Sequence, residues 1–153
     1  MSKGPFLLDE FLPYRLSVLS NRLSAAIAES YSRRYGLSIP EWRVIAVLAH
    51  APGASAAEVG ERTAMDKVAV SRAVRRLQHT GRVSRRIAAG DRRRSMLDLT
   101  AEGRRIYDSV TPVLQRYEEA LLAALSTRER RELDALLRGL EQRARKLSAP
   151  VID

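Results

Sequence analysis

From Met65 to Gly103 the chain reads MDKVAVSRAVRRLQHTGRVSRRIAAGDRRRSMLDLTAEG. The first part of this stretch has helical periodicity, because apolar residues recur at spacings of four and three from Val70 to Leu77. The second part has the period of strands, which are predicted at 83–87 and 95–99 around a turn and form a β-hairpin. A short helix at Ser55–Thr63 and a three-residue turn at 64–66 are predicted just before the first of these elements. Helix, turn, helix and hairpin in this order indicate a winged helix-turn-helix.

Capping boxes mark three helix starts in the sequence. They lie at 38–41, 55–58 and 126–129, where a serine precedes a glutamate by three residues. Asp66 and Thr100 are further candidates for N-caps. The predicted helices cover about Pro13–Tyr35 (ended by Gly36), Pro40–His50, Ser55–Thr63, Asp66–Thr80, Ala101–Leu125 (with a bend or break at Pro112) and Thr127–Leu147.

Positive charge is concentrated in the stretch that predicts the fold. Residues 65–95 contain ten Lys and Arg residues and two acids, a net charge of +8, whereas the whole chain carries +9. Charge focused on one helix and the turn after it is typical of a site for a polyanion, above all nucleic acid. A solvated basic face is the alternative. The hairpin favours nucleic acid, because the arginines at 92–94 gather at a turn, where they repel one another unless they meet phosphates.

The exposed side of the helix supplies candidate DNA contacts. A recognition helix contacts base edges mainly through its N-terminal turns, which predicts Lys67, Val68, Ala69 and Arg72 as base readers. Arg72 matches guanine O6 and N7, and Val68 or Ala69 matches a thymine methyl group. Phosphate contacts predicted on the helix are Ser71, Arg75 and Arg76. The predicted DNA contacts on the hairpin are Arg85, Asp91, Arg92, Arg93 and Arg94.

Apolar stripes on the first and last helices predict a subunit interface. Leucines occupy one face of the last helix from Leu133 to Leu147, and Arg and Glu cover the other. With the stripe at 12–31, they favour a homodimer over packing within one chain. The predicted fold class is mainly α with a small β-hairpin wing. The predicted domains are 1–36, an N-terminal dimerisation helix, 37–100, a winged helix-turn-helix DNA-binding domain, and 101–153, the C-terminal dimerisation helices.

Composition excludes several classes of protein. The chain has no cysteine, which removes disulfides, thiolate metal sites and thiol redox switches. His50 and His79 are far apart in sequence, and no phosphate loop or nucleophile elbow is present, so no enzyme activity, metal or cofactor is predicted. No run of about 18 apolar residues exists and the first residues lack a secretory signal. The expected location is therefore the cytoplasm, without a membrane partner.

Several spaced motifs resemble the MarR family of bacterial transcription regulators. They are Leu37-Ser38-x-x-x-Trp42-x-Val44-Ile45, Met65-Asp66-Lys67-x-x-Val70-Ser71-Arg72, Leu77-x-x-x-Gly81-x-Val83-x-Arg85, Asp91-Arg92-Arg93-Arg94 and Leu97-x-Leu99-Thr100-x-x-Gly103. The resemblance implies a homodimer whose first and last two helices interlock. It also implies that Asp91 holds Arg93 in the minor groove, with Arg92 and Arg94 beside phosphates. The chain departs from the family at Arg82, where a leucine is usual, and at Val59-Gly60, which replaces the usual pattern of the short helix.

The family also implies a small effector, often an aromatic or phenolic anion, that binds between the dimer helices and the winged domain and releases DNA. A larger anion such as an acyl-CoA thioester is compatible. Arg22 or Arg43 could meet its carboxylate, and core packing is the alternative interpretation of Trp42 and Tyr107. The candidate ligand contacts by family position are Leu16, Leu19, Arg22, Leu23, Trp42, Arg43, Ile45, Ala46 and Tyr107.

Three functions compete at this point. The first is a homodimeric, sequence-specific transcriptional regulator, a repressor released from a pseudo-palindromic operator by a small ligand. The second is an architectural DNA-binding protein without sequence preference, which a specificity ratio distinguishes from the first. The third, an enzyme or RNA-binding module, lacks both a catalytic constellation and aromatics on a sheet for base stacking. The sequence favours the first.

Overall fold

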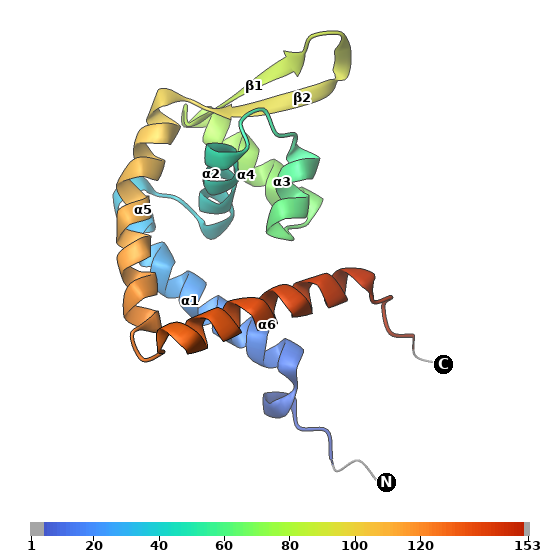
Figure 1. Ribbon diagram of the computed structural model, residues 1–153. Helices are drawn as coiled ribbons and strands as arrows, with labels where there is room; N and C mark the ends of the chain where they lie inside the picture. Colours follow the sequence, from blue (N-terminus) through green and yellow to red (C-terminus); the bar gives the residue numbers. More distant parts are fainter. Residues whose placement is uncertain (1–4, 152–153) are drawn as a thin grey trace. The chain divides into compact units, whose positions relative to one another are not determined.

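The computed structural model describes residues 5–151, with the backbone alone at 92–94, and the chain divides into two compact units at Leu114. The first unit contains a helical bundle with a two-stranded antiparallel hairpin, and α5 continues from it into the second (Figure 1). The elements are η1 (Leu8–Glu10), α1 (Leu12–Tyr35), α2 (Ile39–His50), α3 (Ala56–Thr63), α4 (Lys67–His79), β1 (Val83–Ala88), β2 (Asp91–Leu99), α5 (Ala101–Leu122) and α6 (Thr127–Lys146). The predicted order of helices and strands is confirmed, and so is the fold class.

Local capping sets most helix boundaries, as the sequence predicts. The boxes that begin α2, α3 and α6 are all formed, with backbone N–H groups donating to glutamate oxygens at 3.0, 2.7 and 2.7 Å. The Asp66 side chain accepts from the backbone N–H of Ala69 at 2.8 Å, and Thr100 Oγ1 accepts from that of Gly103 at 3.1 Å. Gly36 ends α1 in the left-handed region at φ 63°, which glycine adopts without strain.

The hairpin is fastened to the helices at its base. Val83 pairs with Leu99, and the antiparallel register continues to Ile87 opposite Ser95 before it shifts. The backbone of Leu97 also exchanges hydrogen bonds with the α2–α3 loop, accepting from Gly53 and donating to Ala54, both at 2.9 Å. The buried core beneath it is drawn from α1 to α5 and from both strands, and includes Tyr31, Leu48, Val59, Val74, Leu77, Val83, Leu97 and Ile106.

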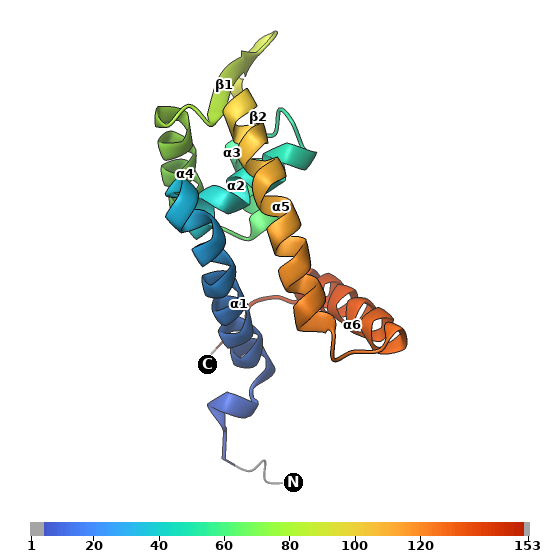
Figure 2. The same cartoon turned by 90° about the vertical axis from the view of Figure 1, so that its left-hand side faces the viewer.

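The first unit also joins the end of α1 to the start of α5, which Figures 1 and 2 show close together. The Tyr35 hydroxyl donates to Ser109 Oγ at 2.8 Å. Arg82, in the turn after α4, donates from Nη2 to the Tyr35 carbonyl at 2.6 Å. Arg82, which departs from the family resemblance described above, thus caps the C-terminal end of α1.

Helix α5 is continuous through Pro112 and ends three residues earlier than the sequence predicts. Its last turn closes with the N–H of Leu125 donating to the Leu122 carbonyl at 3.0 Å. Arg130 Nε, on α6, donates to the same carbonyl at 3.2 Å, and its Nη1 pairs with Glu119 at 2.9 Å. A side chain of the next helix thus binds a backbone carbonyl at the C-terminal end of α5. No local sequence motif predicts this contact.

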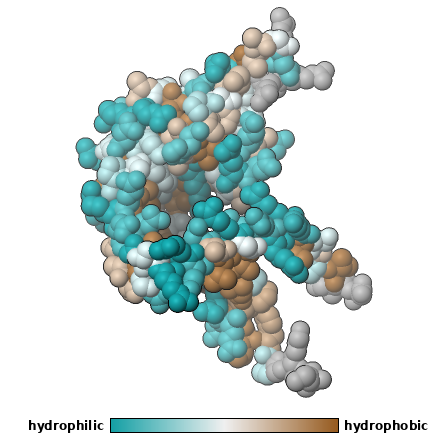
Figure 3. Space-filling model, viewed as in Figure 1, coloured by the Kyte–Doolittle hydropathy of each residue, from teal (hydrophilic) through white to brown (hydrophobic). Residues whose placement is uncertain are grey.

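Each unit exposes apolar side chains along a helix. In the first unit, Leu12, Leu16 and Leu19 are 46, 40 and 52% exposed, and Figure 3 shows apolar surface at this end of α1. In the second, α6 buries none of its residues, and Leu136 and Leu140 are 67 and 44% exposed. Contiguous apolar surface of this kind is typical of an interaction surface.

Candidate nucleic-acid interface

A tight turn sets α4 at an angle to α3. Ala64 occupies the left-handed region at φ 53°, and Thr63 Oγ1 accepts from the backbone N–H of Met65 at 3.4 Å. The next residue, Asp66, caps α4. The predicted three-residue turn between the two helices is therefore present, and the N-terminal end of α4 is left at the surface.

The two sides of α4 differ as the sequence predicts. Its inner side buries Val70, Ala73, Val74 and Leu77 against the core. Ala69 is half-buried, and the exposed residues of the outer side are Lys67, Val68, Ser71, Arg72, Arg75, Arg76 and His79. Val68 is 58% exposed, which is unusual for an apolar residue unless it meets a partner. The candidate base readers and phosphate contacts on this helix thus share one accessible face.

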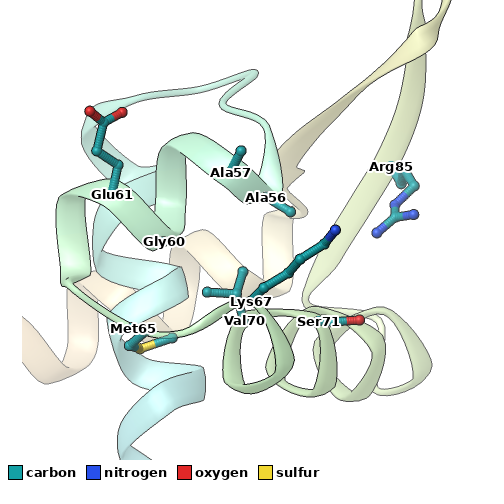
Figure 4. A pocket seen from close by; sticks show the side chains of 9 residues that line it. All are labelled: Ala56, Ala57, Gly60, Glu61, Met65, Lys67, Val70, Ser71 and Arg85. Carbon is teal, nitrogen blue, oxygen red and sulfur yellow. The ribbon is translucent and has the colours of Figure 1, made fainter.

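A pocket of about 550 Å³ lies between α3, α4 and the base of the hairpin. Its floor is apolar and includes Gly60 and Val70, while Lys67 and Ser71 of α4 and Arg85 of β1 stand at its edge. Figure 4 shows the Lys67 amine directed into the space between α4 and β1, on the far side of which Arg85 lies. Two cations on either side of an open space are suited to a phosphate oxygen.

The hairpin adds a second basic element. Arg86 Nε pairs with Asp98 Oδ2 across the strands at 2.8 Å, which stiffens the hairpin, and Ile87 is 65% exposed beyond it. The predicted contacts at Arg92, Arg93 and Arg94 fall on side chains outside the described residues. Asp91 begins β2 and has an interaction partner of its own.

One pairing at this face was not predicted from the sequence. Arg76 forms an ion pair with Glu41 of α2, with Nε 3.0 Å from Oε1, although the Glu41 side chain is only 4% exposed. The other oxygen of Glu41 accepts from the backbone N–H of Ser38 at 3.0 Å. The capping box identified Glu41 as a cap, but nothing in the local pattern links it to a residue 35 positions later.

Aromatic side chains connect α1, α2 and α5. The Trp42 ring stacks between Tyr31 and Tyr107, with centroid distances of 5.4 and 6.0 Å. The Tyr107 hydroxyl lies 2.6 Å from His50 Nε2, and the Arg104 guanidinium is 5.6 Å from the Tyr107 ring centroid. Burial raises the pKa of the Tyr31 hydroxyl above its ordinary value, and nearby Arg43 partly offsets this.

The candidate ligand contacts separate into groups. Trp42 and Tyr107 come together as half-buried members of the aromatic stack, whereas Ile45 is fully buried in the core. Leu19 and Arg22 line a different depression on α1, with Asp9 and Tyr14. The remaining candidates lie on the same two helices: Leu16 and Leu23 on α1, and Arg43 and Ala46 on α2.

Comparison with known proteins accounts for this arrangement. A model of the MarR family matches residues 35–94, which span α2 to the hairpin. A MarR/EmrR family transcriptional regulator from Acinetobacter sp. ADP1 superposes with a TM-score of 0.85 at 25% identity, over 93% of this chain and 100% of that one. The chain belongs to the MarR family. It is therefore a DNA-binding transcriptional regulator with a winged helix-turn-helix.

Other transcriptional regulators match over most of the chain. The HTH-type transcriptional repressor Rv2887 of Mycobacterium tuberculosis is 29% identical over 131 residues, which are 85% of this chain and 91% of the relative. The PcaV transcriptional regulator of Streptomyces coelicolor, solved with its natural ligand, has a TM-score of 0.72 at 26% identity, over 93% of this chain and 99% of that one.

Family membership decides two of the broader questions that the sequence raises. MarR-family regulators are not enzymes, which confirms the expectation that this chain catalyses no reaction. DNA binding and small-molecule effectors are typical of the family. Within the described residues, no helix combines the length and apolarity that a membrane crossing requires.

Proposed function

We propose that this MarR-family regulator is a homodimeric repressor that binds a pseudo-palindromic operator through α4 and the hairpin. The observation that carries the proposal is the outer face of α4, where basic side chains and the exposed Val68 lie together. The opposite face of the same helix is buried in the core. Rv2887 is named a repressor, which supports the same sign of regulation here. Two copies of α4 would enter successive major grooves about 34 Å apart.

The contacts divide by the part of DNA that they meet. Lys67, Val68, Ala69 and Arg72, in the first turns of α4, read base edges. Phosphate contacts come from Ser71 and Arg75 on α4 and from Arg85 at the hairpin base. On the hairpin, Asp91 and Arg93 serve the minor groove, with Arg92 and Arg94 at neighbouring phosphates.

A small aromatic or anionic effector releases the DNA. PcaV was solved with its natural ligand, which supports a ligand-responsive regulator of this fold. The proposed contacts are Trp42 and Tyr107, which are half-buried, with Arg43 for a carboxylate. A ligand there would bear on α1, α2 and α5 at once, because the aromatic stack joins these helices.

Selection of genomic DNA fragments tests the proposal. The purified protein would be incubated with the fragments at about 150 mM salt, where binding to random DNA is suppressed. Recovery of one inverted repeat is expected, and the genes beside it would suggest the effector. Recovery of fragments that share no motif would instead support an architectural DNA-binding protein.

Replacing Arg93 with alanine is expected to weaken operator binding about tenfold or more. An arginine in a narrow minor groove gains from the enhanced negative potential there, and a residue near the tip of the hairpin contributes little to folding. Binding would be measured by fluorescence anisotropy and stability by thermal unfolding. Unchanged operator affinity in Arg93→Ala would show that the hairpin does not contact DNA through this residue.

Charge placed in the α6 stripe is expected to weaken the dimer. Leu140→Glu puts a carboxylate into the apolar face twice, once per subunit, and should raise the dimer dissociation constant about tenfold or more. Gln142→Glu is the matched control, because it adds the same charge well away from Leu140 around the helix. Light scattering across a dilution series measures both. Equal dimer strength in the two variants would argue against α6 as the interface.

A further inference from the structure

Two arginines one helical turn apart on α4 differ in their partners. Arg72 and Arg76 both line a groove between α4 and the start of α2. Arg76 forms an ion pair with Glu41, with Nε 3.0 Å from Oε1, whereas Arg72 forms no hydrogen bond or ion pair with any described side chain. The sequence alone gives no reason to distinguish them, but of the two only Arg76 is paired with an acid among the described residues.

Glu41 is the unusual member of the pair because it is a buried carboxylate. Its side chain is 4% exposed, against 68% for Arg76, and its two oxygens are used by Arg76 and by the Ser38 backbone N–H. A charge removed from water is stable only when it is paired, so Glu41 requires the Arg76 guanidinium. The pair as a unit carries no net charge.

We propose that Glu41 neutralises Arg76 and ties α4 to α2, so that Arg76 does not serve as a phosphate contact and the affinity of the protein for DNA of any sequence is limited. The inference rests on the DNA contact by α4 proposed above. Affinity for random DNA comes almost entirely from phosphate neutralisation, whereas base reading comes from the start of α4. Removing one cation from the phosphate-binding set therefore lowers random binding while the base readers keep their positions.

The size of the effect follows from counterion release. Each neutralised phosphate adds about 0.9 to the slope of log affinity against log salt, which is about fivefold in affinity at 150 mM salt. A dimer that gained one contact per subunit would therefore change its slope by about 1.8 and its affinity for random DNA about 25-fold.

Salt titrations on a random-sequence duplex test the proposal with three variants of the full-length chain. Potassium chloride would be varied from about 50 to about 300 mM, the range over which phosphate contacts dominate. Arg76→Gln should leave the slope unchanged. Glu41→Gln should steepen it by about 1.8, because Arg76 is released, and the double variant should return to the wild-type slope.

Any other pattern overturns the proposal. If Arg76→Gln flattens the slope by about 1.8, Arg76 is a phosphate contact; if Glu41→Gln leaves the slope unchanged, Glu41 does not restrain it. Ser38→Ala is the matched control, because it removes the hydroxyl half of the same capping box and leaves the ion pair intact. A slope in Ser38→Ala equal to that of Glu41→Gln would trace the effect to the cap and also refute the role of the pair.

The same titrations separate this inference from the proposed function. They need neither an operator nor an effector. If the wild-type protein proved to bind DNA without sequence preference, the proposed repressor function would be refuted, but the salt slopes of the variants would still test the role of Glu41. Thermal unfolding of each variant shows that it is folded at the temperature of the titration. The double variant Glu41→Gln/Arg76→Gln is the one expected to fold most safely, because it leaves no unpaired carboxylate in the core.

Discussion

Gly103→Ala is expected to destabilise the protein by about 3 kcal/mol, because overpacking against backbone cannot be relieved by a side-chain rotation. A Cβ atom at this position would lie 2.1 Å from the Arg82 carbonyl oxygen and 3.2 Å from a methyl carbon of Leu99. The Arg82 carbonyl also accepts from the Thr100 N–H at 3.1 Å. Moving it would therefore strain the junction where the hairpin, the end of α4 and the start of α5 meet.

Gly139→Ala provides the control for this prediction. Gly139 lies inside α6, and nothing lies within 4 Å of a Cβ built there, so alanine should stabilise the helix by about 1 kcal/mol. Chemical denaturation of both variants at one protein concentration measures the difference. A Gly103→Ala protein as stable as the wild type would mean that α5 does not approach the Arg82 carbonyl as closely as the structure indicates.

Local signals explain why the boundaries of most helices were predictable. A capping box needs only a serine and a glutamate three residues apart, and all three predicted boxes are formed. The same holds for Gly36, whose left-handed conformation ends α1. Such interactions close within a single turn, so the sequence contains both partners side by side.

Contacts between distant residues explain what the sequence could not show. In the sequence, Arg82 is an additional positive charge without an evident role. In the structure its guanidinium donates to the backbone carbonyl of Tyr35, 47 positions earlier. The sequence predicts Arg76 as a phosphate contact and gives no sign of its ion pair with the buried Glu41, 35 positions earlier. An arginine on an exposed helical face has the same local pattern whether it meets an acid of its own chain or a phosphate, so periodicity alone cannot separate the two roles.

The predicted ligand site shows the same limit in another form. Trp42 and Tyr107 do come together, but they do so in a stack that also includes Tyr31 and serves the packing of three helices. Ile45, on the same helix as Trp42, is wholly inside the core. The structure therefore brings Trp42 and Tyr107 together, but one local pattern serves both packing and ligand-binding side chains, so the sequence could not separate the two roles.

Arg72→Ala is expected to have the largest effect on recognition. An arginine that makes two hydrogen bonds to guanine O6 and N7 contributes about 1–3 kcal/mol of discrimination, and a dimer makes this contact once in each half-site. The loss on the full operator should therefore be about 2–6 kcal/mol, confined to one base position per half-site. Operators substituted singly at each position would be compared for binding to wild type and to Arg72→Ala.

Arg75→Ala is the natural comparison because Arg75 is also an exposed cation on α4 but is placed for phosphates. Its removal should lower affinity by a similar factor for every sequence and reduce the salt slope by about 0.9 per subunit. Arg72→Ala should instead lose its preference at one position while random DNA binding changes much less. A uniform loss with Arg72→Ala, matched by an equal drop in slope, would make Arg72 a phosphate contact and move base reading to Lys67 and Val68. The two variants thus decide which cation of α4 reads sequence, a distinction that their shared charge and exposure leave open.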